Sequence, residues 1–283
     1  MPPRSPRASW WRRCRPRRPA STRWPSGSRP LTDAAAWPEG VARHVLAEID
    51  STNAEALRRA PELTGPAWFL ALRQTAGRGR RGRAWSDPPG NFAATLLTFP
   101  AGPPADAARL SFVAALALQD ALAQVCGPSA RLALKWPNDV LLNGGKVAGI
   151  LLESAGSGRR PAALAIGIGV NLAHAPEPQT LEPGAVPPVS VAGETGHHVD
   201  PETLLDLLAP AFTARERELA REGFAATRAA WLARAARLGE TITARTGAVT
   251  RQGRFDGIDA TGALILTTAA GREAIPAADV HFG

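Results

Sequence analysis

Apolar runs of strand length alternate with stretches of helical spacing along most of the chain. The runs predict strands at residues 41–49, 68–72, 92–99, 132–134, 140–142, 147–152 and 162–172. Helical spacing predicts a short helix at residues 54–60 and long helices within residues 107–125 and 200–238. With 283 residues, the chain is long enough for one large domain and an appended small one.

The pattern changes near Gly239. Residues 240–282 contain short apolar runs separated by glycine turns, which fits a small β-barrel. Residues 174–194 are proline-rich and irregular, with a short extended segment expected near residues 189–191. We therefore predict a larger domain at residues 37–238 and a smaller one at residues 239–283.

The basic charge of the chain belongs to its first residues. The formal net charge is +8, and residues 1–30 hold nine arginines and no acidic residue. Removing them leaves 24 basic and 25 acidic residues, a net charge of −1. Residues 1–36 are rich in Pro, Arg and Ser without periodicity, so we expect a disordered tail. They lack the apolar core of a secretory signal, and dense prolines oppose a mitochondrial transit helix. Another explanation of this arginine-rich segment is a start codon assigned too far upstream.

Cysteine and histidine give no sign of redox or metal chemistry. The two cysteines lie far apart and the five histidines show no metal-ligand spacing. No stretch approaches the 18 apolar residues of a membrane span. We expect a soluble, cytoplasmic protein without a membrane partner.

Both lysines of the chain, Lys135 and Lys146, lie in residues 131–153, whereas arginine occurs 31 times. A lysine retained under such a bias indicates a position that needs a compact ammonium, where a planar guanidinium is too large. Asn143-Gly144-Gly145 predicts a hairpin turn, which brings Lys146 back near Asp139. A solvated surface hairpin is the alternative. The scarcity of lysine in this chain favours a functional site over a solvated hairpin.

Residues 77–85 alternate arginine with glycine between two predicted strands. Three of the glycines spell G-x-G-x-x-G, the fingerprint of dinucleotide binding. That fingerprint requires a helix to open at once, and the stretch instead continues toward Pro88-Pro89-Gly90. We predict a cationic loop suited to neutralising phosphate charge, and an RNA-contacting segment is the alternative.

Two other polar or glycine-rich features admit a structural and a functional explanation. Ser51-Thr52-Asn53 precedes a helix, where such residues ordinarily cap the N-terminus. A helix N-terminus also offers free N–H groups to a polar ligand. Gly167 and Gly169 lie within a buried strand, where glycine either relieves crowding or permits close approach of a ligand.

In combination these motifs closely resemble those of the biotin protein ligases. The family signature KWPND stands at residues 135–139, and K-x-x-G-I-L-x-E stands at residues 146–153. S-T-N at residues 51–53, the arginine loop at residues 77–85 and G-x-G-x-N at residues 167–171 complete the resemblance. It covers residues 42–282 with no departure at a motif position. It implies an α+β fold, in which a mixed or antiparallel sheet of the class II synthetase type is flanked by helices and followed by a C-terminal SH3-like barrel.

The resemblance also implies a reaction. Biotin and ATP would give biotinyl-5′-AMP and pyrophosphate, and the biotinyl group would then pass to one lysine of a biotin carboxyl carrier domain. The family's arginine loop is disordered until ligand binds and then folds across biotin and the adenylate. A Mg²⁺ ion would help to neutralise the triphosphate.

The resemblance assigns site residues motif by motif, and Asp139 is in addition our hypothesis for the group that accepts the proton of the acceptor lysine. The residues implied for catalysis are Lys146, Arg80, Asp139 and Lys135. Those implied for biotin are Ser51, Thr52, Asn53, Gln74, Gly77, Arg78, Lys146 and Gly149. Those implied for ATP are Arg80, Arg83, Trp85, Lys135, Asn138, Asp139 and Asn171, with Mg²⁺ at Asp139.

Rival functions remain open at this point. A lipoate or octanoate ligase has a related fold, although the arginine loop and the intact KWPND argue against it. A non-catalytic nucleic-acid-binding protein would use residues 1–30 and 77–83. Some ligases of the family carry an N-terminal DNA-binding winged helix, but the forty residues before the first motif are too few and lack a helix-turn-helix pattern. We expect no specific DNA binding, and a monomer or homodimer.

Overall fold

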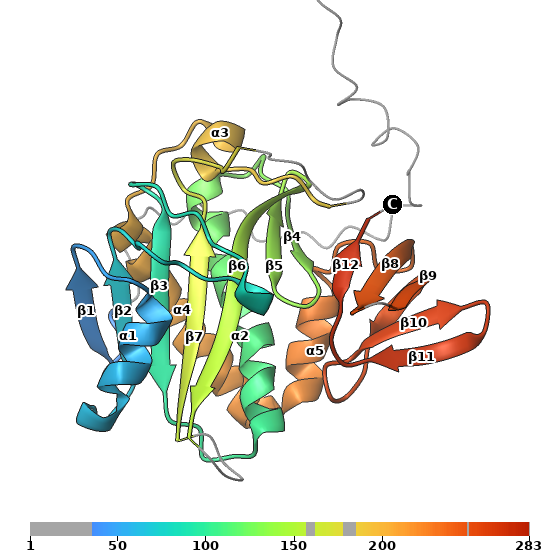
Figure 1. The fold of residues 1–283 in the computed structure, drawn as a ribbon, viewed down its shortest axis with the longest axis horizontal. Helices are drawn as coiled ribbons and strands as arrows, with labels where there is room; N and C mark the ends of the chain where they lie inside the picture. Colours follow the sequence, from blue (N-terminus) through green and yellow to red (C-terminus); the bar gives the residue numbers. More distant parts are fainter. Residues whose placement is uncertain (1–35, 157–161, 178–184, 248, 283) are drawn as a thin grey trace, which may run out of the picture. The chain divides into compact units, whose positions relative to one another are not determined.

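Seven strands form the larger sheet in the order β1-β2-β3-β7-β6-β5-β4 (Figure 1). The computed structural model describes residues 36–156, 162–177, 185–247 and 249–282. β1 pairs parallel with β2 and all other neighbours pair antiparallel, which confirms the predicted mixed sheet. The strands are β1 (Ala42–Leu46), β2 (Ala67–Ala71), β3 (Phe92–Thr98), β4 (Leu132–Lys135), β5 (Asp139–Leu142), β6 (Gly145–Ala155) and β7 (Ala163–Val170).

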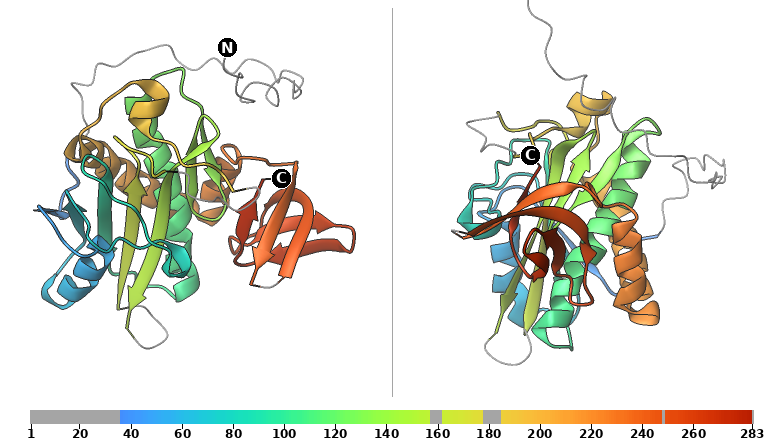
Figure 2. Two further views of the ribbon diagram at one scale, coloured as in Figure 1. Left: turned by 45° about the horizontal axis from the view of Figure 1, so that its top comes forward. Right: turned by 90° about the vertical axis from the view of Figure 1, so that its right-hand side faces the viewer.

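Helices cover the two faces of this sheet unequally, as Figure 2 shows. α1 packs on one face, where Ala56 meets Phe69 and Leu97 in a small apolar cluster. Three longer helices pack on the other face. The helices are α1 (Thr52–Arg59), α2 (Pro104–Cys126), α3 (Val191–Thr195), α4 (Pro201–Glu222) and α5 (Phe224–Leu232), with single turns η1 (Ala60–Glu62) and η2 (Arg80–Gly82).

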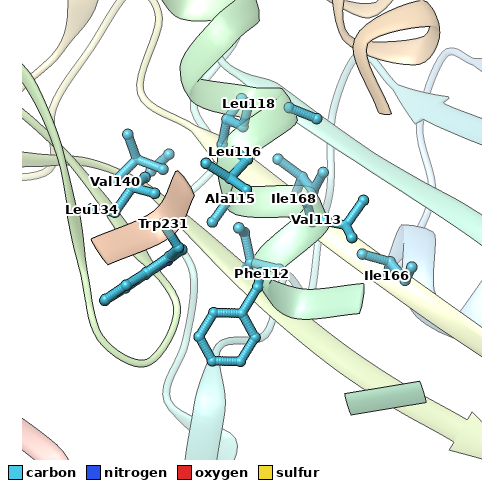
Figure 3. Close-up of a cluster of buried hydrophobic side chains, with 14 of the residues drawn as sticks. Phe112, Val113, Ala115, Leu116, Leu118, Leu134, Val140, Ile166, Ile168 and Trp231 are labelled. Carbon is cyan, nitrogen blue, oxygen red and sulfur yellow. The ribbon is translucent and has the colours of Figure 1, made fainter. Parts of the chain in front are cut away.

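The main core lies between the sheet and α2. Ile166 and Ile168 of β7 point to this side and pack near Phe112 and Val113 of α2, while the alternate residues face the opposite side (Figure 3). The Phe112 and Trp231 rings pack edge to face, with their centroids 5.7 Å apart. The face of the sheet that carries α1 is thereby left free of this core, and a site can form there.

α2 is long and apolar enough to cross a membrane by length and composition alone. The expectation that no stretch approaches a membrane span is therefore wrong for this helix by that criterion. Most of the apolar window is buried within the fold, however, as in the core helix of a soluble protein. The location in the cytoplasm stays a prediction.

Other element boundaries in the structure differ from the predicted ones by a few residues. The helical stretch at 200–238 is two helices, because Gly223 at φ 75° ends α4 and starts α5. Within the segment expected to be extended near residues 189–191, Val189 N donates to the carbonyl of Lys146 at 3.0 Å, whereas Val191 begins α3. The predicted tail (residues 1–36) lies, except for its last residue, outside the described residues.

The C-terminal sheet has five antiparallel strands in the order β11-β10-β9-β8-β12, in agreement with an SH3-like barrel. Residues 271–281 form two strands, β11 and β12, which residues 276–278 separate. Trp136 donates its indole N–H to the carbonyl of Gly262 at 3.0 Å, and the apolar core continues from one sheet to the other. A domain boundary at Gly239 stays a prediction. The strands are β8 (Thr241–Thr246), β9 (Val249–Ile258), β10 (Leu264–Thr268), β11 (Gly271–Ile275) and β12 (Asp279–His281).

Candidate active site

A cavity of about 380 Å³ lies on the face of the larger sheet that carries α1. Its walls come from the N-terminus of α1, the arginine loop, the β5–β6 hairpin, β7, residues 185–188 and β12. Of the predicted site residues, Gly77 alone is missing from its lining. Those that line it are Ser51, Thr52, Asn53, Gln74, Arg78, Arg80, Arg83, Trp85, Lys135, Asn138, Asp139, Lys146, Gly149 and Asn171.

The hairpin brings the two lysines to one carboxylate. Asn143 and Gly144 adopt φ of 51° and 92°, so the turn reverses the chain tightly as predicted. Lys146 Nζ then lies 2.7 Å from one oxygen of Asp139, and Lys135 Nζ lies 3.4 Å from the other. These three side chains together carry one net positive charge at the cavity wall.

Burial and pairing act in opposite directions on these charges. Burial alone would raise the pKa of Asp139, but Lys146 and Lys135 hold it below its ordinary value. Burial lowers the pKa of Lys135 below its ordinary value, although Asp139 opposes this. The carboxylate therefore stays ionised at neutral pH, and its proton affinity is low.

The arginine loop is a closed turn and not a helix. Trp85 N donates to the carbonyl of Gly77 at 2.9 Å, and Gly79 N donates to that of Arg83 at 2.7 Å. Arg81 at φ 56° prevents the single turn η2 from continuing as a helix, which agrees with the rejection of a dinucleotide fingerprint. A Cβ on Gly77 would lie 2.8 Å from the carbonyl oxygen of Trp85. Gly77 thus closes the base of the loop and does not line the cavity.

Asp279 of β12, which no sequence motif singles out, joins this loop to the C-terminal sheet. Its carboxylate pairs with Arg81, with Arg83 at 3.1 Å and with Arg80 at 3.8 Å. Arg80 also approaches the side-chain oxygen of Asn138 at 3.4 Å, and burial lowers its pKa. An acidic residue in a distant small module could not be assigned to the site without the fold.

Trp85 closes the cavity over two glycines. Lys146 Nζ lies 5.8 Å from the centre of the Trp85 ring. A Cβ on Gly169 would lie 2.5 Å from that ring, and a Cβ on Gly149 would lie 3.3 Å from it. Gly169 of β7 therefore makes room for the Trp85 ring of the loop, and close approach of a ligand to this glycine stays a prediction.

We expect Gly169→Ala to expel Trp85 from its position. No shift of a flexible side chain tip relieves the clash, because three ring atoms lie within 2.8 Å of the added Cβ. The reaction that the resemblance implies should slow by about tenfold or more, since misplacement by 1 Å is costly in catalysis. The rate of that implied adenylate formation, followed as pyrophosphate exchange, measures the loss. Gly65→Ala, whose Cβ meets only a carbonyl at 3.6 Å, is the matched control and should change nothing. Equal activity of both variants would contradict the packing role.

The opposite end of the cavity offers uncharged polar groups. Ser51 caps α1, with its hydroxyl accepting from Ala54 N at 3.5 Å. Thr52 N donates to the side-chain oxygen of Gln74 at 2.9 Å, and Gln74 N donates in turn to Asp87 at 3.0 Å. The cap and the binding explanation of this motif are therefore compatible. Burial raises the pKa of Asp87, a residue that the sequence did not single out.

Asn171 supports a wall of the cavity. Its side-chain amide donates to the carbonyl of Val189 at 3.0 Å, and its backbone N–H donates to that of Val147 at 2.8 Å. It thus ties the segment 185–189 to the sheet while lining the cavity itself.

The arrangement separates two kinds of chemistry. The amide of Asn53 stands over Gly167, whereas the ammonium of Lys146 and the Trp85 ring lie over the neighbouring cross-strand pair, Gly149 and Gly169. Such a cavity suits a substrate with an uncharged polar head and an anionic tail beside a polyphosphate. Among the described residues, no three His, Cys, Asp or Glu side chains gather closely enough to hold a metal ion.

Comparison with known proteins gives consistent results. Residues 45–171 match the model of the biotin/lipoate A/B protein ligase family, and residues 238–283 match that of the biotin protein ligase C terminal domain. A biotin–[acetyl-CoA-carboxylase] ligase of Paracoccus denitrificans is 66% identical over 84% of this chain and its own whole length. The bifunctional ligase/repressor BirA of Bacillus subtilis is 33% identical over 84% of this chain and 72% of its own.

The fold has solved relatives as well. A biotin protein ligase from Aquifex aeolicus, in complex with biotin and ATP, superposes with a TM-score of 0.70 at 24% identity. The match covers 86% of this chain and 99% of that one.

Proposed function

The chain belongs to the biotin/lipoate A/B protein ligase family, and we propose that it is an ATP-dependent biotin ligase acting on a biotin carboxyl carrier domain. The observation that carries this is the cavity, which places the S-T-N motif, the arginine loop and both lysines around one space. Lipoate and octanoate ligases share the family model, but the C-terminal module and the 66% identical relative favour biotin. The match leaves no support for a non-catalytic nucleic-acid-binding protein.

In the first step, biotin and ATP form biotinyl-5′-AMP and pyrophosphate. The biotin carboxylate attacks the α-phosphorus and needs no base, because it is already ionised. Lys146 would hold that carboxylate, which its position 2.7 Å from Asp139 and 5.8 Å from the centre of the Trp85 ring supports. Lys135, Asn138 and the arginines Arg80 and Arg83 would neutralise the phosphates. Residues 51–53 with Gln74 would bind the uncharged end of biotin.

In the second step, the acceptor lysine attacks the acyl carbon of biotinyl-AMP, AMP leaves, and an amide forms. A free lysine has a pKa of about 10.4, so only about one in 10³ is neutral near pH 7.4, a cost of about 4 kcal/mol. Asp139 was our hypothesis for the group that takes its proton. The geometry opposes that role, because both oxygens face ammonium groups and the pKa of Asp139 lies below its ordinary value. We propose instead that Asp139 orients Lys135 and Lys146.

A magnesium ion held directly by Asp139 does not fit the same geometry. Both carboxylate oxygens are engaged by Lys135 and Lys146, and a divalent cation would have to displace an ammonium group.

The partner of this enzyme is a biotin carrier domain of a carboxylase. This proposal is supported by the 66% identical relative, which is a biotin–[acetyl-CoA-carboxylase] ligase. Monomer or homodimer, and the lack of specific DNA binding, stay predictions.

The transfer reaction tests the proposal directly. Purified enzyme, biotin and ATP are incubated with a carrier domain and with the same domain carrying Lys→Arg at its acceptor position. We expect a mass increase of one biotinyl group on the first carrier and none on the second. An unmodified first carrier would contradict the proposed function.

We also expect Asp279→Ala to loosen the arginine loop. Each pair is partly exposed, so their combined loss should cost about 1 kcal/mol of loop ordering and raise tryptic cleavage there about fivefold. Mass spectrometry of fragments that begin at Gly82 or Ala84 gives the rate. Asp206→Ala, which removes a comparable surface pair with Arg43, is the control. Equal cleavage in the two variants would show that Asp279 does not order the loop.

A further inference from the structure

A buried or partly buried hydrogen-bond network engages both polar atoms of the Asn53 side chain at the cavity wall. Asn53 Nδ2 donates to Glu153 Oε2 at 2.8 Å and to the carbonyl of Leu151 at 3.3 Å. Thr95 Oγ1 lies 2.7 Å from Asn53 Oδ1, to which it can donate, and 2.8 Å from Thr52 Oγ1. Asn53 lines the cavity, whereas Glu153 and Thr95 lie behind it.

The sheet itself sets this arrangement. Thr95 in β3, Gly167 in β7 and Leu151 in β6 are direct cross-strand partners. Asn53 stands over the glycine, since a Cβ there would lie 2.3 Å from Asn53 Oδ1. A hydroxyl donor therefore flanks the amide on one side, and a carbonyl and a carboxylate flank it on the other.

Only one orientation of the Asn53 amide satisfies these neighbours. Turning it by 180° would bring Oδ1 against the Glu153 carboxylate and the Leu151 carbonyl, which both lack a proton to donate. The Thr95 hydroxyl could accept from a turned amide, so the orientation is set by the Leu151 carbonyl and the Glu153 carboxylate on the other side. In the observed orientation both N–H groups point to protein acceptors, and Oδ1 keeps one lone pair for a ligand.

From this geometry we propose that Glu153 and Thr95 are positioning residues that fix Asn53 as a hydrogen-bond acceptor and so select a carboxylic acid whose head carries an N–H group. The inference rests on the proposed function. The cyclic urea of biotin supplies such an N–H, while the hydrocarbon and dithiolane heads of octanoate and lipoate supply none. Rejection of acids that leave a buried polar group unpaired is a strong source of specificity.

Glu153→Leu and Thr95→Val test the proposal, because each removes one polar neighbour of Asn53 at similar size. We expect the KM for biotin to rise about tenfold to a hundredfold, as for a polar group left unpaired, with kcat at saturating biotin and the KM for ATP little changed. Pyrophosphate exchange gives all three constants. Glu153→Gln keeps an acceptor oxygen toward Asn53 and should restore most of the lost affinity.

Thr98→Val, on the same strand, is the matched control for Thr95→Val and should leave the KM for biotin unchanged. An unchanged KM for biotin in both test variants would overturn the proposal. So would an equal loss in Glu153→Gln and Glu153→Leu with a fall in melting temperature, because the residue would then serve stability alone. Failure of the wild-type enzyme to exchange pyrophosphate with biotin would instead contradict the proposed function.

Discussion

Lys146→Ala should lower biotin-dependent adenylate formation by about 10²–10³-fold, the usual effect of removing one charged or hydrogen-bonding group that stabilises a transition state. Lys146 lies 2.7 Å from Asp139 and faces the Trp85 ring in the cavity. Without its ammonium, the Asp139 carboxylate would face the incoming biotin carboxylate, and the two anions would repel each other. Steady-state pyrophosphate exchange at saturating ATP measures the loss.

Lys146→Arg makes this prediction more specific. A planar guanidinium has no equivalent position between Asp139, Gly149 and the Trp85 ring, so we expect the variant to remain at least about tenfold impaired although its charge is kept. Arg221→Ala is the control, because Arg221 is an exposed cation outside the cavity that pairs only with its neighbour Glu222 among the ion pairs of the described residues. This variant should keep its activity. Full activity of Lys146→Arg would show that charge alone suffices, and that the retained lysine reflects no steric need.

Asp139→Asn should destabilise the fold by about 3–5 kcal/mol near pH 7, because it leaves the buried ammonium of Lys135 and the partly exposed one of Lys146 without their shared counterion. Lys135 is the more affected, since it is almost fully buried and its pKa already lies below its ordinary value. Urea unfolding of both proteins at several pH values measures the difference. Asp206→Asn, from an exposed pair with Arg43, should change stability little.

The pH dependence of this difference follows from the direction of each pKa shift. The folded pKa of Asp139 lies below its ordinary 3.8, so its stabilisation is present above about pH 4 and is lost as the pH falls through the folded value. In the variant, Lys135 has lost its counterion and its folded pKa should fall further below 10.5. Between that value and about 10.5 the unfolded state binds more protons, so the stability of the variant rises with pH. The difference in unfolding free energy between the wild type and Asp139→Asn should therefore become smaller toward pH 10. A gap that is constant with pH would contradict the role of the buried charge pair.

Periodicity predicted the elements of this fold well where a single face was buried. The strand at 162–172 and the helix at 107–125 were found within a few residues, because alternation and helical spacing are set by contact with one core. The break at Gly223 and the start of α3 at Val191 were not found. Both depend on how a glycine or a capping serine meets its tertiary surroundings, which a local pattern does not contain.

The site was predictable as far as its residues lie in contiguous motifs. The retained lysines and the turn at Asn143 led to the pairing of Lys146 with Asp139. Glu153 was visible as a motif position, but its contact with Asn53 was not, because a hundred residues separate them. Thr95 looked like any β-branched strand residue. Asp279 became recognisable only when β12 placed it beside the arginine loop.

The most direct measurement is biotin-dependent exchange of labelled pyrophosphate into ATP, compared side by side with lipoate and octanoate. We expect exchange with biotin, negligible exchange with the other two acids, and loss of the signal in Lys146→Ala. Exchange that requires lipoate or octanoate, or exchange with biotin that is undiminished without Lys146, would contradict the assignment of this cavity to biotin activation.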